Sequence, residues 1–280
     1  MKNFSILLFI AVSFIFLNVS AEAEEKQPTQ IKLYAIDCGR IDVSNFAGFS
    51  DTSDYDNKST KLADPCFLII HPKGALLWDT GLPDSLVNKP KTSDVYYLTK
   101  SISLQDSLKK INLKLSDIKY VSVSHSHFDH MGNLYQLTKS TWILQKAELK
   151  YAQTHPNPFV IDASKLNSWN AVHKIMISGD YDVFGDGTVK ILNTPGHTPG
   201  HQSLELKLPQ AGVIILSGDE FHQRSSFIPL RVPTFNASRA DTMASADRIK
   251  LLLKNTKGRL IIQHDAQDFE GLPKFPEYLD

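Results

Sequence analysis

The chain has no excess of either charge: its 280 residues include 30 lysines and arginines and 30 aspartates and glutamates. Proteins that bind nucleic acid neutralise many phosphates and are usually basic, so we expect no nucleic-acid partner. Gly/Ser-rich linkers, low-complexity blocks and repeats of solenoid period are also absent after the N-terminal segment. These absences favour one compact domain, which we place at residues 28–280.

The N-terminus lacks an apolar run long enough to span a bilayer. Its uncharged stretch, from about Phe4 to Leu17, falls short of the roughly 20 residues that a transmembrane helix needs. A lysine precedes the stretch and small residues follow it, as in secretory signal peptides. We therefore predict a signal peptide over residues 1–21 and a periplasmic or secreted protein without a stable membrane anchor. A retained N-terminal anchor is the alternative.

Cysteine is scarce, since Cys38 and Cys66 are the only two in the chain. An exported protein meets an oxidising compartment, in which a disulfide can form. The sequence does not give the distance between the two Cα atoms, which decides whether they can be bridged. A Cys38–Cys66 disulfide and two buried, unpaired cysteines therefore remain alternatives.

Most apolar runs are short and bounded by turn residues, which is typical of strands. The run "FLIIHPKGALLWD" predicts a hairpin that turns at residues 72–74. Helices are expected over four segments: residues 104–110, 130–137, 147–153 and 241–255. Strands in the majority with helices between them predict an α/β fold, in which stacked sheets are covered by helices.

Two further expectations concern particular segments. The last predicted helix should bury one stripe, formed by Met243, Ala246, Ile249, Leu252 and Leu253. Three stretches that contain aromatic residues fit no regular element and are expected to be long loops: residues 43–65, 84–101 and 154–170. Such loops often serve as lids or partner surfaces.

Histidine and aspartate are concentrated in "HSHFDH", residues 125–130. His125 and His127 are two positions apart, so in extended backbone they project to the same side. Imidazoles this close lower one another's proton affinity, which a bound cation compensates. Asp129 and His130 follow after the chain turns and can face a second ion. The cluster therefore predicts a site for two metal ions.

Other candidate ligands stand just beyond apolar strand-like runs, and such positions can converge on one edge of a sheet. They are His197, Asp219 and His264. Zinc accepts imidazole and carboxylate ligands, and Asp219 is the natural candidate to bridge two ions. The remaining histidines lack this context, and we interpret them as structural or solvent-facing: His71, His155, His173 and His201.

The same motifs carry a family resemblance. "HSHFDH" matches the HxHxDH signature of the metallo-β-lactamase superfamily, and "TPGHTPGH", "LSGDE" and "IIQHD" resemble its later motifs in the expected order. "LLWDTG" resembles the superfamily's aspartate-bearing strand turn. The resemblance implies an αββα sandwich, two mixed β-sheets flanked by helices, with two Zn²⁺ ions at one edge. It assigns His125, His127 and His197 to one ion, Asp129, His130 and His264 to the other, and Asp219 to both.

Within that superfamily the chain is most similar to the N-acyl homoserine lactonases, the quorum-quenching branch, through "IDCGRIDV" and "HSHFDHMGN". The resemblance implies that a metal-bridging hydroxide opens the lactone ring while Asp129 carries a proton to the leaving oxygen. The best-known members carry a tyrosine three residues after the bridging aspartate, and His222 stands there in this chain. We expect His222 to help stabilise the oxyanion.

Two other functions stay open at this point. One is another exported dinuclear hydrolase of the same fold, a phosphotriesterase or a β-lactamase-like enzyme; the cysteine-containing β-lactamases are disfavoured because they carry cysteine at the position of Asp219. The other is a zinc-binding module without catalysis, against which the complete ligand set argues. Related lactonases are commonly dimers, so we expect a symmetric homodimer.

An acyl lactone substrate would need an apolar groove, because each buried methylene contributes about 0.8 kcal/mol. Candidate walls are Phe46, Phe49, Met131, Phe221, Phe227 and Ile228. Ordinary core packing is the alternative interpretation for each of them.

Overall fold

The computed structural model describes residues 30–154 and 170–280. The predicted signal peptide, His155 and nearly all of the predicted loop 154–170 lie outside the described residues. Within them, no helix combines the length and apolar character that crossing a membrane requires.

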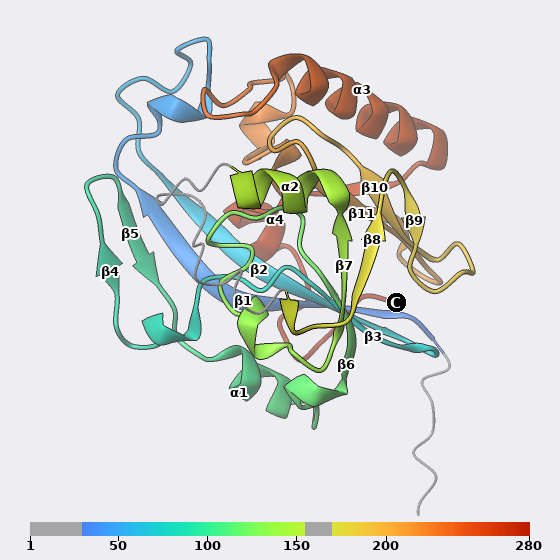
Figure 1. Ribbon diagram of the computed structural model, residues 1–280. Helices are drawn as coiled ribbons and strands as arrows, with labels where there is room; N and C mark the ends of the chain where they lie inside the picture. The colour runs from blue at the N-terminus through green and yellow to red at the C-terminus, as the bar shows by residue number, and fades with distance from the viewer. Residues whose placement is uncertain (1–29, 155–169) are drawn as a thin grey trace, which may run out of the picture.

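The first sheet has eight strands in the order β4-β5-β1-β2-β3-β6-β7-β8 (Figure 1). Their bounds are β1 Lys32–Val43, β2 Thr60–His71, β3 Gly74–Trp78, β4 Lys91–Thr92, β5 Tyr96–Thr99, β6 Ile118–Ser122, β7 Thr141–Gln145 and β8 Lys174–Ile177. The strands from β4 to β3 pair antiparallel, and those from β3 to β8 pair parallel. β2 and β3 form the predicted hairpin, which turns at residues 72 and 73.

The second sheet has five strands in the order β13-β12-β11-β10-β9. Their bounds are β9 Tyr181–Asp182, β10 Val189–Asn193, β11 Gln202–Leu208, β12 Gly212–Leu216 and β13 Arg259–Ile261. All pairs are antiparallel except β12 with β13, so this sheet is mixed like the first.

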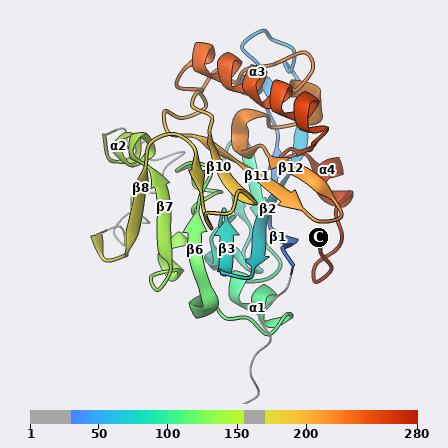
Figure 2. The same ribbon diagram turned by 90° about the vertical axis from the view of Figure 1, so that its right-hand side faces the viewer.

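The two sheets pack face to face and helices cover their outer faces (Figure 2). The helices are α1 Leu104–Lys109, α2 Lys146–Thr154, α3 Arg239–Thr256 and α4 Ala266–Glu270. The short α4 differs from the others, because its Phe269 packs into the cluster between the sheets. One apolar cluster joins the facing sides of the sheets, through residues such as Phe67 and Leu76 in the first and Leu204 in the second. A second cluster lies between the first sheet and α1, and another between the second sheet and α3. The layers therefore follow the expected αββα order.

The long α3 helix follows its predicted span closely but is rotated slightly from the predicted stripe. Ala246, Ile249, Leu252 and Leu253 contact the core cluster as predicted. Met243 was placed wrongly, because 45% of it is exposed while its neighbour Thr242 is buried. The Thr242 hydroxyl donates to the Ser238 carbonyl and so satisfies its polar group inside the contact.

Two other segment predictions need correction. The helix expected over residues 130–137 is a short 3₁₀ turn, Leu134–Gln136. The Gly132 N–H donates to the Gly81 carbonyl at 3.0 Å and the His130 carbonyl accepts from the Thr80 N–H at 2.7 Å, so these backbone groups bond to the turn after β3 instead of within a helix. The loops predicted at 43–65 and 84–101 are partly strand, since β2 begins at Thr60 and β4 pairs with β5. The start of β2 shows no alternation because Leu62, Ala63, Asp64 and Pro65 are all buried, and β4 consists of two exposed residues.

Candidate metal centre

Four stretches of the chain meet at one edge of the sandwich, each just beyond the end of a strand. The "HSHFDH" motif follows β6, and the other stretches follow β10, β12 and β13. These stretches carry seven buried side chains that gather in two groups: His125, His127, His197 and Asp219; and Asp129, His130 and His264. The structure thus brings together all seven candidate ligands selected from the sequence.

The first group contains three imidazoles. His197 Nε2 lies 3.1 Å from both His125 Nε2 and His127 Nδ1. Asp219 Oδ2 lies 3.4 Å from His197 Nε2 and 3.7 Å from His125 Nε2. Tetrahedral zinc with ligands at about 2.1 Å holds its donor atoms about 3.4 Å apart, so this spacing suits one ion.

The second group is built around His130 and His264, whose Nε2 atoms lie 3.3 Å apart. Asp129 completes it, with Oδ1 3.8 Å from His130 Nε2 and Oδ2 3.7 Å from His264 Nε2. Asp219 faces this group through its other oxygen, since Oδ1 lies 3.3 Å from His130 Nε2 and 3.1 Å from His264 Nε2. Asp219 therefore presents one oxygen to each group, which is the geometry of a bridging carboxylate.

These residues fit two divalent cations. Asp219 Oδ1 is buried and accepts no hydrogen bond from the described residues. A buried acceptor without a partner costs about 1–3 kcal/mol, which a cation would remove. Imidazole and carboxylate are typical zinc ligands, and both groups offer them at the spacing of one coordination shell.

The two groups differ in their proton affinity. Burial lowers the pKa of every histidine in the first group, that of His127 to about 3. Burial also acts against protonation of the second group, but the charge of Asp219 overcomes it. The pKa of His130 is therefore raised well above its usual value and that of His264 to about 9. Negative charge from aspartates thus dominates the surroundings of the second group.

The first group is supported by a buried carboxylate from α2. Glu148 accepts hydrogen bonds from the backbone and hydroxyl of Ser126, at 2.7 and 2.6 Å, and from the hydroxyl of Thr198 at 2.6 Å. It thereby ties the loop after β6 to the loop after β10. His197 is also oriented by Asn236, whose Oδ1 lies 2.9 Å from the histidine Nδ1.

The second group is supported by β2 and by the turn after β3. Asp79 Oδ2 lies 3.1 Å from His130 Nδ1, and its Oδ1 accepts the Ser124 backbone N–H at 2.6 Å. The Ala63 carbonyl lies 2.7 Å from His264 Nδ1. Such partners of a ligating histidine fix its tautomer and ring orientation.

Sequence reasoning missed most of these supports. Asp79 had a signal, because it is the aspartate of the "LLWDTG" motif. Glu148 and Asn236 had none, since a glutamate in an amphipathic helix and an asparagine in a loop usually face solvent. Only the fold places them beside the ligands.

A cleft adjoins both groups, and polar and apolar side chains share its lining. Asp129 and His222 line it, and His222 Nε2 lies 3.1 Å from Asp219 Oδ2. The apolar part of the lining consists of Ile41, Phe49, Leu62, Tyr96, Phe128 and Phe235. The His222 ring packs edge-on against Phe49 and Phe235, with ring centroids 5.0 and 5.9 Å apart.

Of the six apolar side chains predicted to form a groove, only Phe49 lines this cleft. Phe46 stacks behind it with ring centroids 4.3 Å apart. Met131 belongs to the core under the first sheet, while Phe221 and Phe227 pack in the cluster beneath α3. Ile228 is 73% exposed. Nearness to a ligand in sequence was a poor guide, because these side chains turn away from the cleft.

The other described histidines have structural or exposed positions. His201 Nε2 accepts the Asp219 backbone N–H at 2.9 Å, so it helps to place the bridging residue. His71 pairs with Asp186 at 3.1 Å, and His173 is exposed.

Cys38 and Cys66 are joined by a disulfide, which decides between the two alternatives left open by the sequence.

Comparison with known proteins agrees with this architecture. The chain is 30% identical to the N-acyl homoserine lactonase AttM of Azorhizobium caulinodans over 90% of its own length and 100% of the relative's. It is also 30% identical to the N-acyl homoserine lactonase AiiA of Bacillus thuringiensis subsp. kurstaki, covering 89% and 98% of the two chains.

Among solved structures, one similar fold is an N-acyl homoserine lactone hydrolase with the product N-hexanoyl-L-homoserine bound at its catalytic metal center. It shares 28% identity and a TM-score of 0.78, covering 90% of this chain and 100% of the other. The family model of the metallo-beta-lactamase superfamily matches residues 60–264, from the start of β2 to the last candidate ligand. This chain, with its two stacked sheets and its paired ligand groups, belongs to the metallo-beta-lactamase superfamily.

Proposed function

We propose that this protein is an exported dinuclear-zinc hydrolase that opens the lactone ring of N-acyl homoserine lactones, and hence a quorum-quenching enzyme. The observation that supports this best is the pair of ligand groups that share Asp219. They occur in a chain similar to named lactonases over about nine tenths of its length.

Zinc is the proposed metal because imidazole nitrogens dominate the ligand set. Bound there, two ions would lower the pKa of a shared water and polarise the lactone carbonyl. The protein's part is to hold the ligands rigidly and to bring the lactone ring into the cleft beside them.

Asp129 is proposed to carry a proton to the ring oxygen as it leaves. Its carboxylate lines the cleft and lies beside the second group, so it adjoins the space that the lactone ring would occupy. A positioned carboxyl in this role contributes about 10²–10⁴-fold to a rate.

His222 is proposed to hold the carbonyl oxygen of the lactone. Its Nε2 lies 3.1 Å from Asp219 Oδ2, the oxygen that faces the first group, and its ring packs against Phe49 and Phe235. An imidazole N–H donates one hydrogen bond, as the phenol of a tyrosine does. The apolar lining beyond His222, including Ile41 and Leu62, would receive the acyl chain.

The proposal is tested by the turnover of short-chain and long-chain N-acyl homoserine lactones by the purified mature protein. Chelation should abolish ring opening and added zinc should restore it, with an efficiency above about 10⁴ M⁻¹s⁻¹. Failure with two ions demonstrably bound would reject the substrate. β-Lactams, aryl esters and phosphotriesters would then be the substrates to test.

Export is part of the proposal, and the Cys38–Cys66 disulfide supports it because disulfides persist in oxidising compartments. Mass spectrometry of periplasmic and secreted fractions should find a mature N-terminus near residue 22. An uncleaved chain confined to the cytosol would contradict export. A symmetric homodimer is also proposed, and sedimentation velocity of the mature protein tests it.

A further inference from the structure

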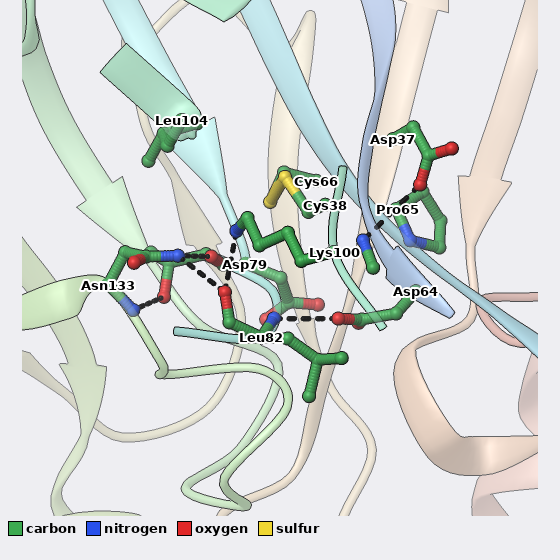
Figure 3. The surroundings of a disulfide bond; sticks show 12 residues. Asp37, Cys38, Asp64, Pro65, Cys66, Asp79, Leu82, Lys100, Leu104 and Asn133 are labelled. Carbon is green, nitrogen blue, oxygen red and sulfur yellow. Dashed lines mark hydrogen bonds between the residues drawn. A yellow bond between two sulfur atoms is a disulfide. The ribbon is translucent and has the colours of Figure 1, made fainter. Parts of the chain in front are cut away.

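The Cys38–Cys66 disulfide joins neighbouring strands of the first sheet and is completely enclosed. Cys38 lies in β1 and Cys66 in β2, and both are buried. Figure 3 shows Asp64, Asp79 and Leu82 around it, so the disulfide lies close to the segments that support the second ligand group. Two of these segments lead from the disulfide to His264 and His130.

The first segment is the part of β2 that ends at Cys66. Ala63, three residues earlier, pairs twice with His264: its N–H donates to the His264 carbonyl at 3.1 Å, and its carbonyl lies 2.7 Å from His264 Nδ1. The carbonyl of Pro65, the residue before Cys66, accepts a hydrogen bond from the Gln263 side chain at 2.8 Å. The backbone that orients the His264 ring is therefore anchored at the disulfide.

The second segment is the turn from Asp79 to Leu82, which packs directly on the disulfide. Gly81 has a φ of +63°, and a Cβ there would lie 2.2 Å from Cys38 Cβ and 3.1 Å from Cys66 Sγ. The same turn holds His130, because the Thr80 N–H donates to the His130 carbonyl at 2.7 Å. The Asp79 carboxylate contacts the ring of His130, as described above.

The two segments are also tied to each other. Asp64 Oδ2 accepts the Leu82 N–H at 2.7 Å, and the Leu82 carbonyl accepts from Lys100 Nζ at 2.6 Å. The supports of His130 and His264 thus meet at one place, with the disulfide at its centre. Two supports of the first group, Glu148 and Asn236, come from α2 and from the loop before α3, which the disulfide does not join. A third, Ser124, contacts His125 and bonds to the turn through Asp79, so it links this turn to the first group.

We propose that the Cys38–Cys66 disulfide is a positioning element for the second metal group, so that breaking it weakens the second ion while leaving the first ion bound. The inference rests on the proposed dinuclear centre. Loss of outer support around a metal ligand typically lowers affinity by about 10–100-fold. We expect about a tenfold loss for the second ion and less than about a twofold change for the first.

The test measures the affinity for zinc, with zinc alone as the probe. It uses two variants, in each of which one ligand group is weakened and the other is intact. His197→Ala weakens the first group and leaves the second, and His264→Ala does the reverse. Cys38→Ala/Cys66→Ala, added to each background, should weaken zinc binding about tenfold with His197→Ala and hardly at all with His264→Ala. Equal losses in both backgrounds would mean a general structural role, and no loss in either would also overturn the proposal.

Reduced wild-type protein provides a second route if the double variant does not fold. Because the disulfide is enclosed, the protein is reduced in denaturant by a water-soluble phosphine and then refolded. The phosphine cleaves the S–S bond to two thiols and is itself oxidised to the phosphine oxide, with the oxygen taken from water, and thiol titration verifies the reduction. In reduced protein, the second zinc ion should dissociate with a Kd about tenfold higher than in oxidised protein, while the Kd of the first ion stays nearly unchanged. Release of both ions together, or unchanged retention of both, would contradict the proposal.

The oxidised, unmutated protein separates this inference from the proposed function. If it binds fewer than two zinc ions per chain, the dinuclear centre itself is rejected. If it binds two and hydrolyses lactones while the disulfide has no selective effect, only the positioning role is rejected.

Discussion

The two halves of the metal centre are built from the same motif but are held in different ways. In the first half the outer ring nitrogens face neutral groups, since Ser124 Oγ lies 3.0 Å from His125 Nδ1 and Asn236 supports His197. In the second half a carboxylate, Asp79, supports His130. The two halves therefore differ in charge: Asp79 and Asp129 place negative charge on the second half, whereas the cleft adjoins both halves. The first half is expected to hold its ion and the second half to do the chemistry.

Removing the shared residue should destroy both halves at once. Asp219→Ala takes one ligand from each group, so we expect loss of both ions and a fall in lactone turnover of more than about 100-fold, the upper limit for losing an outer partner. Metal analysis and turnover on the same sample measure it. Asp247→Asn, an exposed site on α3, is the matched control and should change neither. Retention of both ions would refute the bridging role.

A change in the second half alone should separate chemistry from binding. Asp129→Asn keeps an oxygen ligand but removes the proton carrier, so turnover should fall by about 10²-fold or more while zinc content falls less. Measuring zinc content and kcat on the same preparation shows whether turnover falls more than zinc binding does. Parallel losses of both would make Asp129 only a ligand.

Changing the charged support should affect the second half more than the first. Asp79→Asn preserves the shape of the side chain but removes the negative charge beside His130, and we expect about 10-fold weaker binding of one zinc ion. The matched change in the first half, Asn236→Ala, removes a neutral partner of His197 and should cost less. Zinc titrations of both variants compare them, and a larger effect from Asn236→Ala would reverse the comparison.

The smallest expected effect on zinc comes from the carboxylate that ties the loops of the first half. Glu148→Gln leaves an acceptor for Ser126 but places an amide N–H toward other donors, because Glu148 accepts from Thr198 and Gly200 as well. We expect a loss of about 1–3 kcal/mol in the free energy of unfolding. Denaturant unfolding measures it. Any loss of zinc affinity in Glu148→Gln should fall on the first ion, whereas Cys38→Ala/Cys66→Ala should weaken the second ion. If both variants weaken the same ion, the two halves do not have separate supports.

The ligands could be predicted from the sequence because each follows a strand end, and because four of them lie within the six residues 125–130. Stacked sheets covered by helices could be predicted from short apolar runs with helices between them, whereas the αββα order of the layers was predicted from the resemblance to the metallo-β-lactamase superfamily. The cleft was not predictable, because its walls come from strands and loops far apart in sequence. Ile41, Leu62 and Phe235 meet only in the folded chain, whereas Met131, next to a ligand, points into the core.

The most direct test of the account is a titration of zinc into metal-free protein while the ring opening of N-hexanoyl homoserine lactone is followed. Two groups that share Asp219 predict that two zinc ions bind per chain and that most activity appears only with the second equivalent. Full activity at one equivalent, or no ring opening with two equivalents bound, would contradict it.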